Sequence, residues 1–480
     1  MRRSGKMQVR PNISSDNTSA AMKISKTDAL ASTFLRPTLR FEQQDLTSFA
    51  GLVVFQALFA RLRLSQRMAR CFRHRNAVTI FPLHKIVLLL VVHVLLGFRC
   101  LRECRYYADD PLVLRVLGLR RLPDVSTISR HLSSLDALSV ERLEALRTDL
   151  VVERLSDLPV GCITLDFDGS VIGTRRRAEG VAVGFNKKKK GQRSYYPLKC
   201  TVAQTGQVLD VLHRSGNVHD SNGARDFIRA CVERVRAVRP GKRAIEVRMD
   251  SAFYSDEILT ELEALGVRYT VSVPFERFTA MKSEIEQRIE WRDIDEWRDA
   301  FERRWQPAAW SAPRRFIFVR TFTAKQGKAP LQLDLFEPRS YHFEHKVIVT
   351  NSRAELDELV LCHEGRGSQE GLFAEMKSEN ALAYVPTKTW LGNRAYMAAM
   401  TLAHNLSREL TMVTSAPSRG RTDKRAALWV FPRIATVRRY LLQRAGRLIR
   451  PQGRLTLSMS ANDAIRTDIE IALEKLEQIG

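Results

Sequence analysis

Between residues 162 and 273 the chain switches repeatedly between strand-like and helix-like patterning. Short apolar runs bounded by turn residues alternate there with segments whose apolar residues recur every three or four positions. The pattern predicts strands at 162–168, 195–204, 208–215, 244–250 and 269–273, and helices at 222–238 and 255–265. Strands that alternate with helices pack as a mixed sheet covered on both sides, so we predict an α/β fold.

The preceding part of the chain predicts helices alone. From about residue 41 to 154, apolar residues recur at three- and four-residue spacing with almost no strand pattern. The most apolar run, 86–98, is too short to cross a bilayer and contains His93, so we predict a buried helix. The helix predicted after Pro123 has hydroxyls and an arginine in its first turns, which suits either an approach to phosphate or an ordinary bundle.

Residues from about 275 to 345 interrupt the alternation of strands and helices. They contain four of the six tryptophans and short strand-like runs at 315–321, 331–336 and 341–343. We therefore predict a β-rich insertion, followed by a strand at 346–351 and by helices after about residue 388.

The charge of the chain favours a polyanionic partner. Its 77 Lys and Arg residues outnumber 53 Asp and Glu residues, for a formal net charge of +24. Nucleic acid is the usual partner of so basic a chain, and an anionic membrane surface is the less common one. A loop with Lys187, Lys188, Lys189, Lys190 and Arg193 is dense enough to follow a phosphate backbone, although a solvated charged loop has the same composition.

The cysteines and the N-terminus predict an intracellular protein. Seven cysteines are scattered without CxxC pairs, which favours reduced thiols in the cytoplasm. The first 30 residues are polar and rich in Ser, Lys and Arg, with no apolar core of a signal peptide. We predict that residues 1–35 are disordered.

Three acidic residues stand at positions suited to metal binding. Asp168 and Asp250 each end a predicted strand and precede a small residue, so each carboxylate can project from the edge of a sheet. Asp166 is a rival to Asp168, because residues two apart in a strand point to the same side. Glu370 belongs to a predicted helix nearer the C-terminus.

The helix with Glu370 carries an unusual combination of side chains. His363, Arg366, Glu370 and Lys377 follow one another at steps of three, four and seven residues. At about 100° per residue, these side chains lie within roughly 60° of one another on one helical face. A surface helix with an i,i+4 ion pair between Arg366 and Glu370 is the ordinary alternative.

Together the acids predict a site for hard cations beside a phosphodiester. All-oxygen sites suit Mg²⁺ or Mn²⁺, and two such ions promote in-line phosphoryl transfer. Arg366 and Lys377 would hold the phosphates of the strand being cut. Without ions the three acids Asp168, Asp250 and Glu370 would repel one another, so the site makes more sense with metal bound.

These residues resemble the DDE transposases of bacterial insertion sequences, in the group with a Tyr-x2-Arg-x3-Glu-x6-Lys signature. The spacing of Arg366, Glu370 and Lys377 matches that signature, and His363 stands at its tyrosine position. Further similar pieces, spread over about residues 40 to 455, are Asp168-Gly169-Ser170, Asp250-Ser251-Ala252-Phe253-Tyr254, Gly216-Asn217-Val218-His219-Asp220 and Ala403-His404-Asn405-Leu406.

The resemblance implies a ribonuclease-H-like core with a β-strand insertion between the second aspartate and the glutamate. The 120 residues from Asp250 to Glu370, against 82 from Asp168 to Asp250, leave room for such an insertion. It also implies two metal ions on the three acids, DNA contacts by Arg366, Lys377 and His363, and cleavage through a DNA hairpin. An aromatic residue of the insertion would stack on a flipped base.

The expected protein is thus an insertion-sequence transposase that acts on double-stranded DNA as a homodimer. We expect it in the bacterial cytoplasm, associated with the nucleoid and not with a membrane. We expect a helical DNA-binding region at 36–155, a catalytic region at 156–390 with its insertion at about 275–345, and a basic helical region at 391–480. A metal-dependent nuclease without strand transfer and a non-catalytic DNA-binding derivative are the alternatives.

Overall fold

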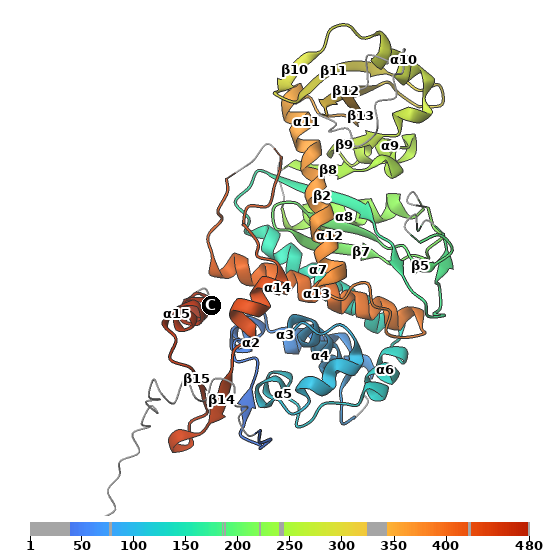
Figure 1. The fold of residues 1–480 in the computed structure, drawn as a ribbon. Coiled ribbons are helices and arrows are strands. Elements are labelled where there is room, and N and C mark those ends of the chain that lie inside the picture. Colours follow the sequence, from blue (N-terminus) through green and yellow to red (C-terminus); the bar gives the residue numbers. More distant parts are fainter. Residues whose placement is uncertain are drawn as a thin grey trace, which may run out of the picture. The chain divides into compact units, whose positions relative to one another are not determined.

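The computed structural model describes residues 39–75, 79–184, 186, 189–219, 222–239, 244–323, 343–420 and 424–478 (Figure 1). The chain divides into two units, Met1–Gln44 and Asp45–Gly480, and all of the elements below belong to the second. The segment predicted to be disordered, 1–35, lies outside the described residues.

Helices make up the first part of the second unit, as the sequence predicts. They are α2 (Leu52–Arg61), α3 (Leu64–Cys71), α4 (Leu83–Leu95), α5 (Pro111–Leu117), α6 (Val125–Ser133) and α7 (Ala137–Ser156), with 3-10 turns η1 (Arg73–Arg75) and η2 (Leu101–Tyr107). Asp110 caps α5 by accepting from Leu112 N and Val113 N, and Gly118 ends that helix in the left-handed conformation.

The apolar run in this region forms a core helix. Every residue of α4 from Ile86 to Leu95 is buried, including His93, whose Nδ1 lies 2.6 Å from the hydroxyl of Tyr107. No helix within the described residues is both long and apolar enough to cross a membrane. The predicted buried helix is therefore confirmed for residues 86–95, whereas the chain turns after Leu95 and Gly97 is exposed.

The described residues form a mixed sheet of nine strands in the order β10-β11-β12-β13-β9-β8-β2-β6-β7. The strands are β2 (Cys162–Gly169), β6 (Leu198–Val202), β7 (Gln207–Leu212), β8 (Ala244–Met249), β9 (Arg268–Val273), β10 (Arg292–Asp295), β11 (Arg298–Trp305), β12 (Arg314–Phe322) and β13 (Phe343–Thr350). Strands β2, β8 and β9 are parallel to one another, and the remaining neighbours are antiparallel.

The predicted insertion extends this same sheet. Strands β10 to β13 continue it beyond β9, and η4 (Phe275–Arg277) and α10 (Thr279–Gln287) precede them. The strand predicted at 315–321 is β12. The runs at 331–336 and at 341–342 lie outside the described residues.

Helices cover both faces of the central strands, which confirms the predicted α/β architecture. On one face, α8 (Ala224–Val238) and α9 (Asp256–Ala264) bury apolar side chains against Phe167 and Met249. Along the other face run α11 (Leu356–Glu364), the 3-10 turn η5 (Gly365–Gly367) and α12 (Ser368–Ser378), drawn in orange in Figure 1.

A long buried helix, α13 (Trp390–Thr414), joins this sheet to the N-terminal helices. It packs against α4, α7 and β7. The side chain of Asn405 accepts a hydrogen bond from Val208 N and donates one to Val208 O, both at 2.8 Å. Asn405 thus satisfies the main chain of β7, the last strand of the sheet, in place of a further strand.

The C-terminal region shares one apolar core with the N-terminal helices, including Leu58, Leu143, Leu402 and Leu476. It contains α14 (Ile434–Val437), the π-helical turn η6 (Arg438–Leu442), η7 (Pro451–Gly453) and α15 (Asp463–Gln478). Strands β1 (Leu46–Thr47), β14 (Gly446–Ile449) and β15 (Thr456–Met459) form a small sheet that ties the two regions together.

Some of the basic residues at 419–454 hold the fold together. The guanidinium of Arg438 donates to the carbonyl oxygens of Val94 and Leu95 at the end of α4, at 2.6 and 3.1 Å, and is buried there. Burial lowers the pKa of Arg438 to about 10. At this helix end Val94 O also accepts from Gly97 N, so Arg438 adds a second donor there and supplies one to Leu95 O.

Candidate active site

The two aspartates predicted as metal ligands come at the ends of neighbouring parallel strands. Phe167 of β2 pairs in register with Met249 of β8, and Asp168 and Asp250 are the residues that follow them. Parallel strands lie about 4.8 Å apart, so the two residues are neighbours across the edge of the sheet. Both are half-buried, and the carboxylate of Asp250 accepts from Ala252 N to begin the turn η3 (Ser251–Phe253).

Asp166, the rival first acid, is held inside the sheet. Arg248 of β8 lies opposite it and donates from Nε and Nη2 to its two carboxylate oxygens, at 2.5 and 2.7 Å. The Asp166 side chain is 1% exposed and that of Arg248 is fully buried. Burial raises the pKa of Asp166, while Arg248 and, further away, Arg366 oppose this effect. Asp166 therefore serves an internal ion pair.

The helix expected from His363 to Lys377 is divided in two. Helices α11 and α12 are joined by the 3-10 turn Gly365–Gly367. Gly365 packs so tightly that an added Cβ would lie 1.7 Å from Lys424 O and 2.4 Å from Arg248 Nη1. A 3-10 turn winds more tightly than an α-helix, so the four side chains do not share the single face that regular helical spacing predicts.

His363 lies on the inner side of α11. Its Nε2 is 2.8 Å from the hydroxyl of Ser272, its Nδ1 is 3.0 Å from that of Thr270, and the residue is 2% exposed. Burial lowers the pKa of His363 well below its ordinary value, so the ring is neutral. Both ring nitrogens are engaged by β9, which leaves neither for a phosphate in this conformation.

Helix α12 is fixed to the sheet beside the strand-end aspartates. Gln369 Nε2 donates to the hydroxyl of Thr201 at 2.7 Å, and Thr201 of β6 pairs with Asp166 of β2. Glu370, the next residue, is exposed at the first turn of the helix. Arg366 and Lys377 are half-buried on either side of it along the chain.

Lys199 is a component of the site that sequence reasoning missed. It lies directly opposite Asp168 in the antiparallel pair of β6 and β2 and is fully buried. Its Nζ lies 3.5 Å from the ring centroid of Phe373 in α12 and has no hydrogen-bond partner among the described residues. Burial lowers its pKa well below the ordinary value, Lys377 adds to this, and Asp168 opposes it. The one signal in the sequence is a lysine inside an otherwise uncharged strand.

The carboxylates of Asp168 and Asp250 suit a hard cation, but Glu370, the third predicted ligand, is not grouped with them. Among the described residues, no three Asp, Glu, His or Cys side chains are grouped so as to hold a metal ion. Asp168 and Asp250 supply neighbouring carboxylate oxygens, the donors that Mg²⁺ and Mn²⁺ prefer. Glu370 faces solvent on the adjacent helix.

The basic loop is described only in part. Lys187 and Lys188 lie outside the described residues, whereas Lys189, Lys190 and Arg193 are exposed. The backbone N–H of Lys189 donates to the side chain of Asn186 at 3.0 Å, which shapes the turn of the loop.

The four tryptophans of the insertion all lie near other rings, Trp297 stacking on Phe322 with the ring centroids 6.5 Å apart. Trp291 contacts Phe301, Trp305 contacts Phe316, and Trp310 contacts Tyr254. Trp297, in the turn between β10 and β11, is 52% exposed. It is the one of these four tryptophans that is exposed, the other three being half-buried.

All seven cysteines lie in described segments, and none forms a disulfide. Burial raises the pKa of Cys71 to about 11 and that of Cys362 to about 12. These thiols are thus protonated near neutral pH, as expected of inert core cysteines.

Two strand-end aspartates on a mixed sheet, beside a helix that carries Glu370 and Lys377, are groups of the kind that metal-dependent phosphoryl transfer uses. The chain belongs to the family described as transposase DDE domain group 1, whose model matches residues 36–480. It is a DDE transposase, and its activity is phosphoryl transfer on DNA.

Among solved structures, the chain is similar to piggyBac transposase in a synaptic complex with hairpin DNA. The identity is 12% and the TM-score 0.40, over 82% of this chain and 80% of that one. No curated protein matches the chain.

Proposed function

We propose that this DDE transposase is the enzyme of a bacterial insertion sequence, which it cuts out and pastes into new DNA. It binds the terminal inverted repeats, cleaves one strand to free a 3′-hydroxyl, and uses that hydroxyl on the opposite strand to form a hairpin and later on the target. The family match to residues 36–480 and the net charge of +24 support this proposal.

One observation carries the assignment of the active site. Asp168 and Asp250 each follow the last paired residue of two adjacent parallel strands, so two distant carboxylates meet at one edge. The central strand order β7-β6-β2-β8-β9, with antiparallel strands on one side and parallel strands on the other, supports a ribonuclease-H-like core.

We assign Asp168, Asp250 and Glu370 as the ligands of two divalent ions, Mg²⁺ or Mn²⁺. Their carboxylates would hold such ions, which would supply activation of the attacking oxygen and stabilisation of the leaving oxygen of the phosphodiester. Glu370 follows Gln369, which fixes the start of α12 to Thr201 of β6, the strand next to β2.

The basic residues around these acids position the DNA. Arg366 and Lys377 flank Glu370 along the chain and would hold the phosphates on either side of the scissile bond. Exposed Lys189, Lys190 and Arg193 would follow the backbone further along. His363 is better suited to hold α11 on β9, since both of its ring nitrogens are engaged there.

Glu370→Gln tests the proposal, because it removes the acid and keeps its size. It should abolish cleavage of a duplex that carries the element end while leaving the affinity for that duplex within about twofold. Asp357→Asn, which alters a different acid in the first turn of α11, is the matched control and should cleave normally.

Two further measurements separate the rival functions. A pre-cut end with a free 3′-hydroxyl should be joined to target DNA, whereas a nuclease without strand transfer gives no joined product. Mn²⁺ binding, measured by electron paramagnetic resonance, should weaken in Asp168→Asn and Asp250→Asn.

If Glu370→Gln cleaved like the natural protein, the site would be wrongly assigned.

A further inference from the structure

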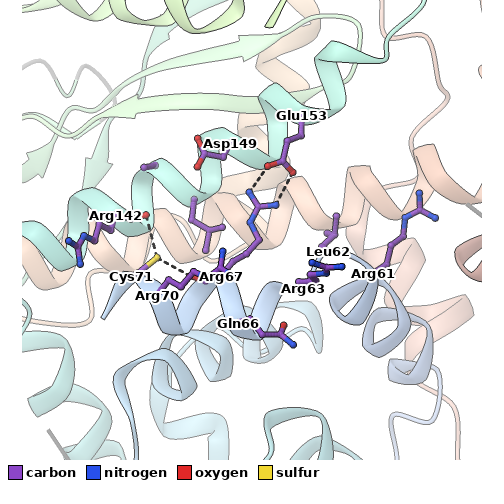
Figure 2. Close-up of a pocket in the computed structure, with 12 residues that line it drawn as sticks. Arg61, Leu62, Arg63, Gln66, Arg67, Arg70, Cys71, Arg142, Asp149 and Glu153 are labelled. Carbon is purple, nitrogen blue, oxygen red and sulfur yellow. Dashed lines mark hydrogen bonds and ion pairs between the residues drawn. The ribbon is translucent and has the colours of Figure 1, made fainter. Parts of the chain in front are cut away.

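Away from the strand-end aspartates, the helical region contains a large groove between α3 and α7. Its volume is about 960 Å³. Five arginines line it, namely Arg61, Arg63, Arg67, Arg70 and Arg142 (Figure 2). So many guanidinium groups around one hollow call for an anionic occupant.

Local sequence builds the arginine wall of this groove. Arg63, Arg67 and Arg70 recur at four- and three-residue steps, which places them within about 60° on one side of α3. The opposite side of the helix buries Leu64 and Met68. The wall is therefore an amphipathic helix, and Arg67 and Arg70 of its polar side follow Arg63, the residue that precedes its first turn.

The charges of the groove are arranged in three zones. In the middle, Glu153 of α7 accepts from both Nη atoms of Arg67, at 2.8 and 2.6 Å. Figure 2 shows Arg61 and Arg63 towards one end of the groove and Arg70 and Arg142 towards the other. The central arginine is neutralised by its partner, so the positive charge available to a ligand lies at the two ends.

We propose that this groove holds the phosphodiester backbone of double-stranded DNA, without regard to base sequence. The proposal rests on the proposed function and adds a second DNA contact to it. Arg63, Arg70 and Arg142 are exposed, with Arg142 Nη1 lying 3.2 Å from His74 Nδ1. Arginine binds phosphate bidentately. Five arginines against Asp149 and Glu153 leave a surplus of positive charge. Contacts of this kind release counterions and depend strongly on salt.

The first test neutralises the exposed arginines. The triple variant R63Q/R70Q/R142Q should bind a duplex more weakly, and the slope of log affinity against log salt should fall by about 3, about 1 per lost phosphate contact. The matched control R225Q/R292Q/R466Q removes the same charge from surface arginines on other elements, with side chains 46%, 59% and 65% exposed. Equal slopes for the two triple variants would overturn the proposal.

The second test predicts a gain in affinity for DNA, which a misfolded variant would not show. Glu153→Gln frees Arg67 and removes a negative charge from the groove, so affinity for DNA should rise severalfold. An unchanged or lower affinity in this variant would contradict the proposal.

Both tests use a duplex with the element end and an unrelated duplex of equal length. Equal effects on the two identify the shared backbone as the ligand, and an effect on the element end alone would contradict sequence-independent binding. All binding is measured in chelator, without cleavage. If the groove does not bind DNA, the two triple variants will show the same salt dependence. If instead the proposed function is wrong, the natural protein will not cleave the element end.

Discussion

Arg248 and Asp166 face each other on the parallel strands β8 and β2 and form a buried, two-pronged ion pair. The remaining Nη1 of Arg248 donates to the carbonyl oxygens of Cys362 and Lys424, at 2.7 and 2.9 Å. One guanidinium thus joins two central strands, the end of α11 and the segment near residue 424. Because Asp166 is committed to this pair, Asp168 is the residue that we propose as the first acid of the site.

Exchange of Asp166 and of Asp168 for asparagine should therefore have opposite consequences. Asp166→Asn leaves a buried guanidinium without its counter-charge and should cost about 3–5 kcal/mol of the free energy of unfolding. Asp168→Asn should change stability by no more than about 1 kcal/mol and abolish cleavage. Urea denaturation and a cleavage assay on both variants check this, and a stable, active Asp166→Asn would refute the assignment.

The junction of α11 and α12 should tolerate a methyl group at one glycine and not at the other. Gly365→Ala would push a Cβ into the main chain at Lys424, so it should cost about 1–3 kcal/mol or more and reduce cleavage. Gly367 meets nothing within 4 Å, and Gly367→Ala should be neutral or stabilise by up to about 1 kcal/mol. Thermal unfolding of the pair provides the comparison, and equal losses would show that the close packing at Gly365 is not the cause.

Lys199→Met should separate stability from activity. The buried Nζ has no hydrogen-bond partner among the described residues, so an apolar side chain of similar length should leave stability unchanged or raise it. Cleavage should fall about 10- to 100-fold, because Asp168 loses the amine that lies directly opposite it in the strand pair. Lys282→Met, on the exposed side of α10, is the control. Unchanged cleavage would make Lys199 a packing residue only.

His404 should contribute to the loss of stability in acid. Its Nε2 donates to Gly206 O at 2.9 Å, its Nδ1 accepts from Asn380 at 3.1 Å, and burial lowers its pKa to about 3. The unfolded chain, with a histidine pKa near 6.5, binds the proton first, so stability is present above about pH 6.5 and is lost as the pH falls towards 3.

The variant His404→Gln keeps a donor towards Gly206 and cannot take up this proton. Its free energy of unfolding should fall less steeply between pH 6.5 and 4, by up to about 1.4 kcal/mol per pH unit. Urea titrations across that range measure how the free energy of unfolding changes with pH. The slope of the variant stays above zero, because burial also lowers the pKa of His93 to about 4 and that of His213 to about 3. Parallel profiles for the variant and the natural protein would exclude this role.

Strand positions near the site were predictable because burial leaves a local pattern. The strands expected at 244–250 and 269–273 are β8 (Ala244–Met249) and β9 (Arg268–Val273). Apolar residues at alternate positions, in short segments that end in turn residues, suffice for this. The same reasoning located Asp168 and Asp250 at strand ends.

The inward side of α11 was not predictable in this way. Regular helical spacing put His363 on the face of Glu370, but the chain near Lys424 approaches Gly365 and the helix tightens there. Lys199 was missed for a similar reason: a single lysine in a strand shows neither its cross-strand neighbour nor the ring above it.

The sequence alone determined the alternation of strands and helices, the buried helix α4 and the acids that end β2 and β8, since each depends on side chains a few residues apart. Tertiary structure decided the order of the nine strands, the pairing of Asp166 with Arg248, the placement of Lys199 under α12 and the arginine groove between α3 and α7. These features join residues between about 30 and more than 170 positions apart, and their energies arise only when the chain has packed.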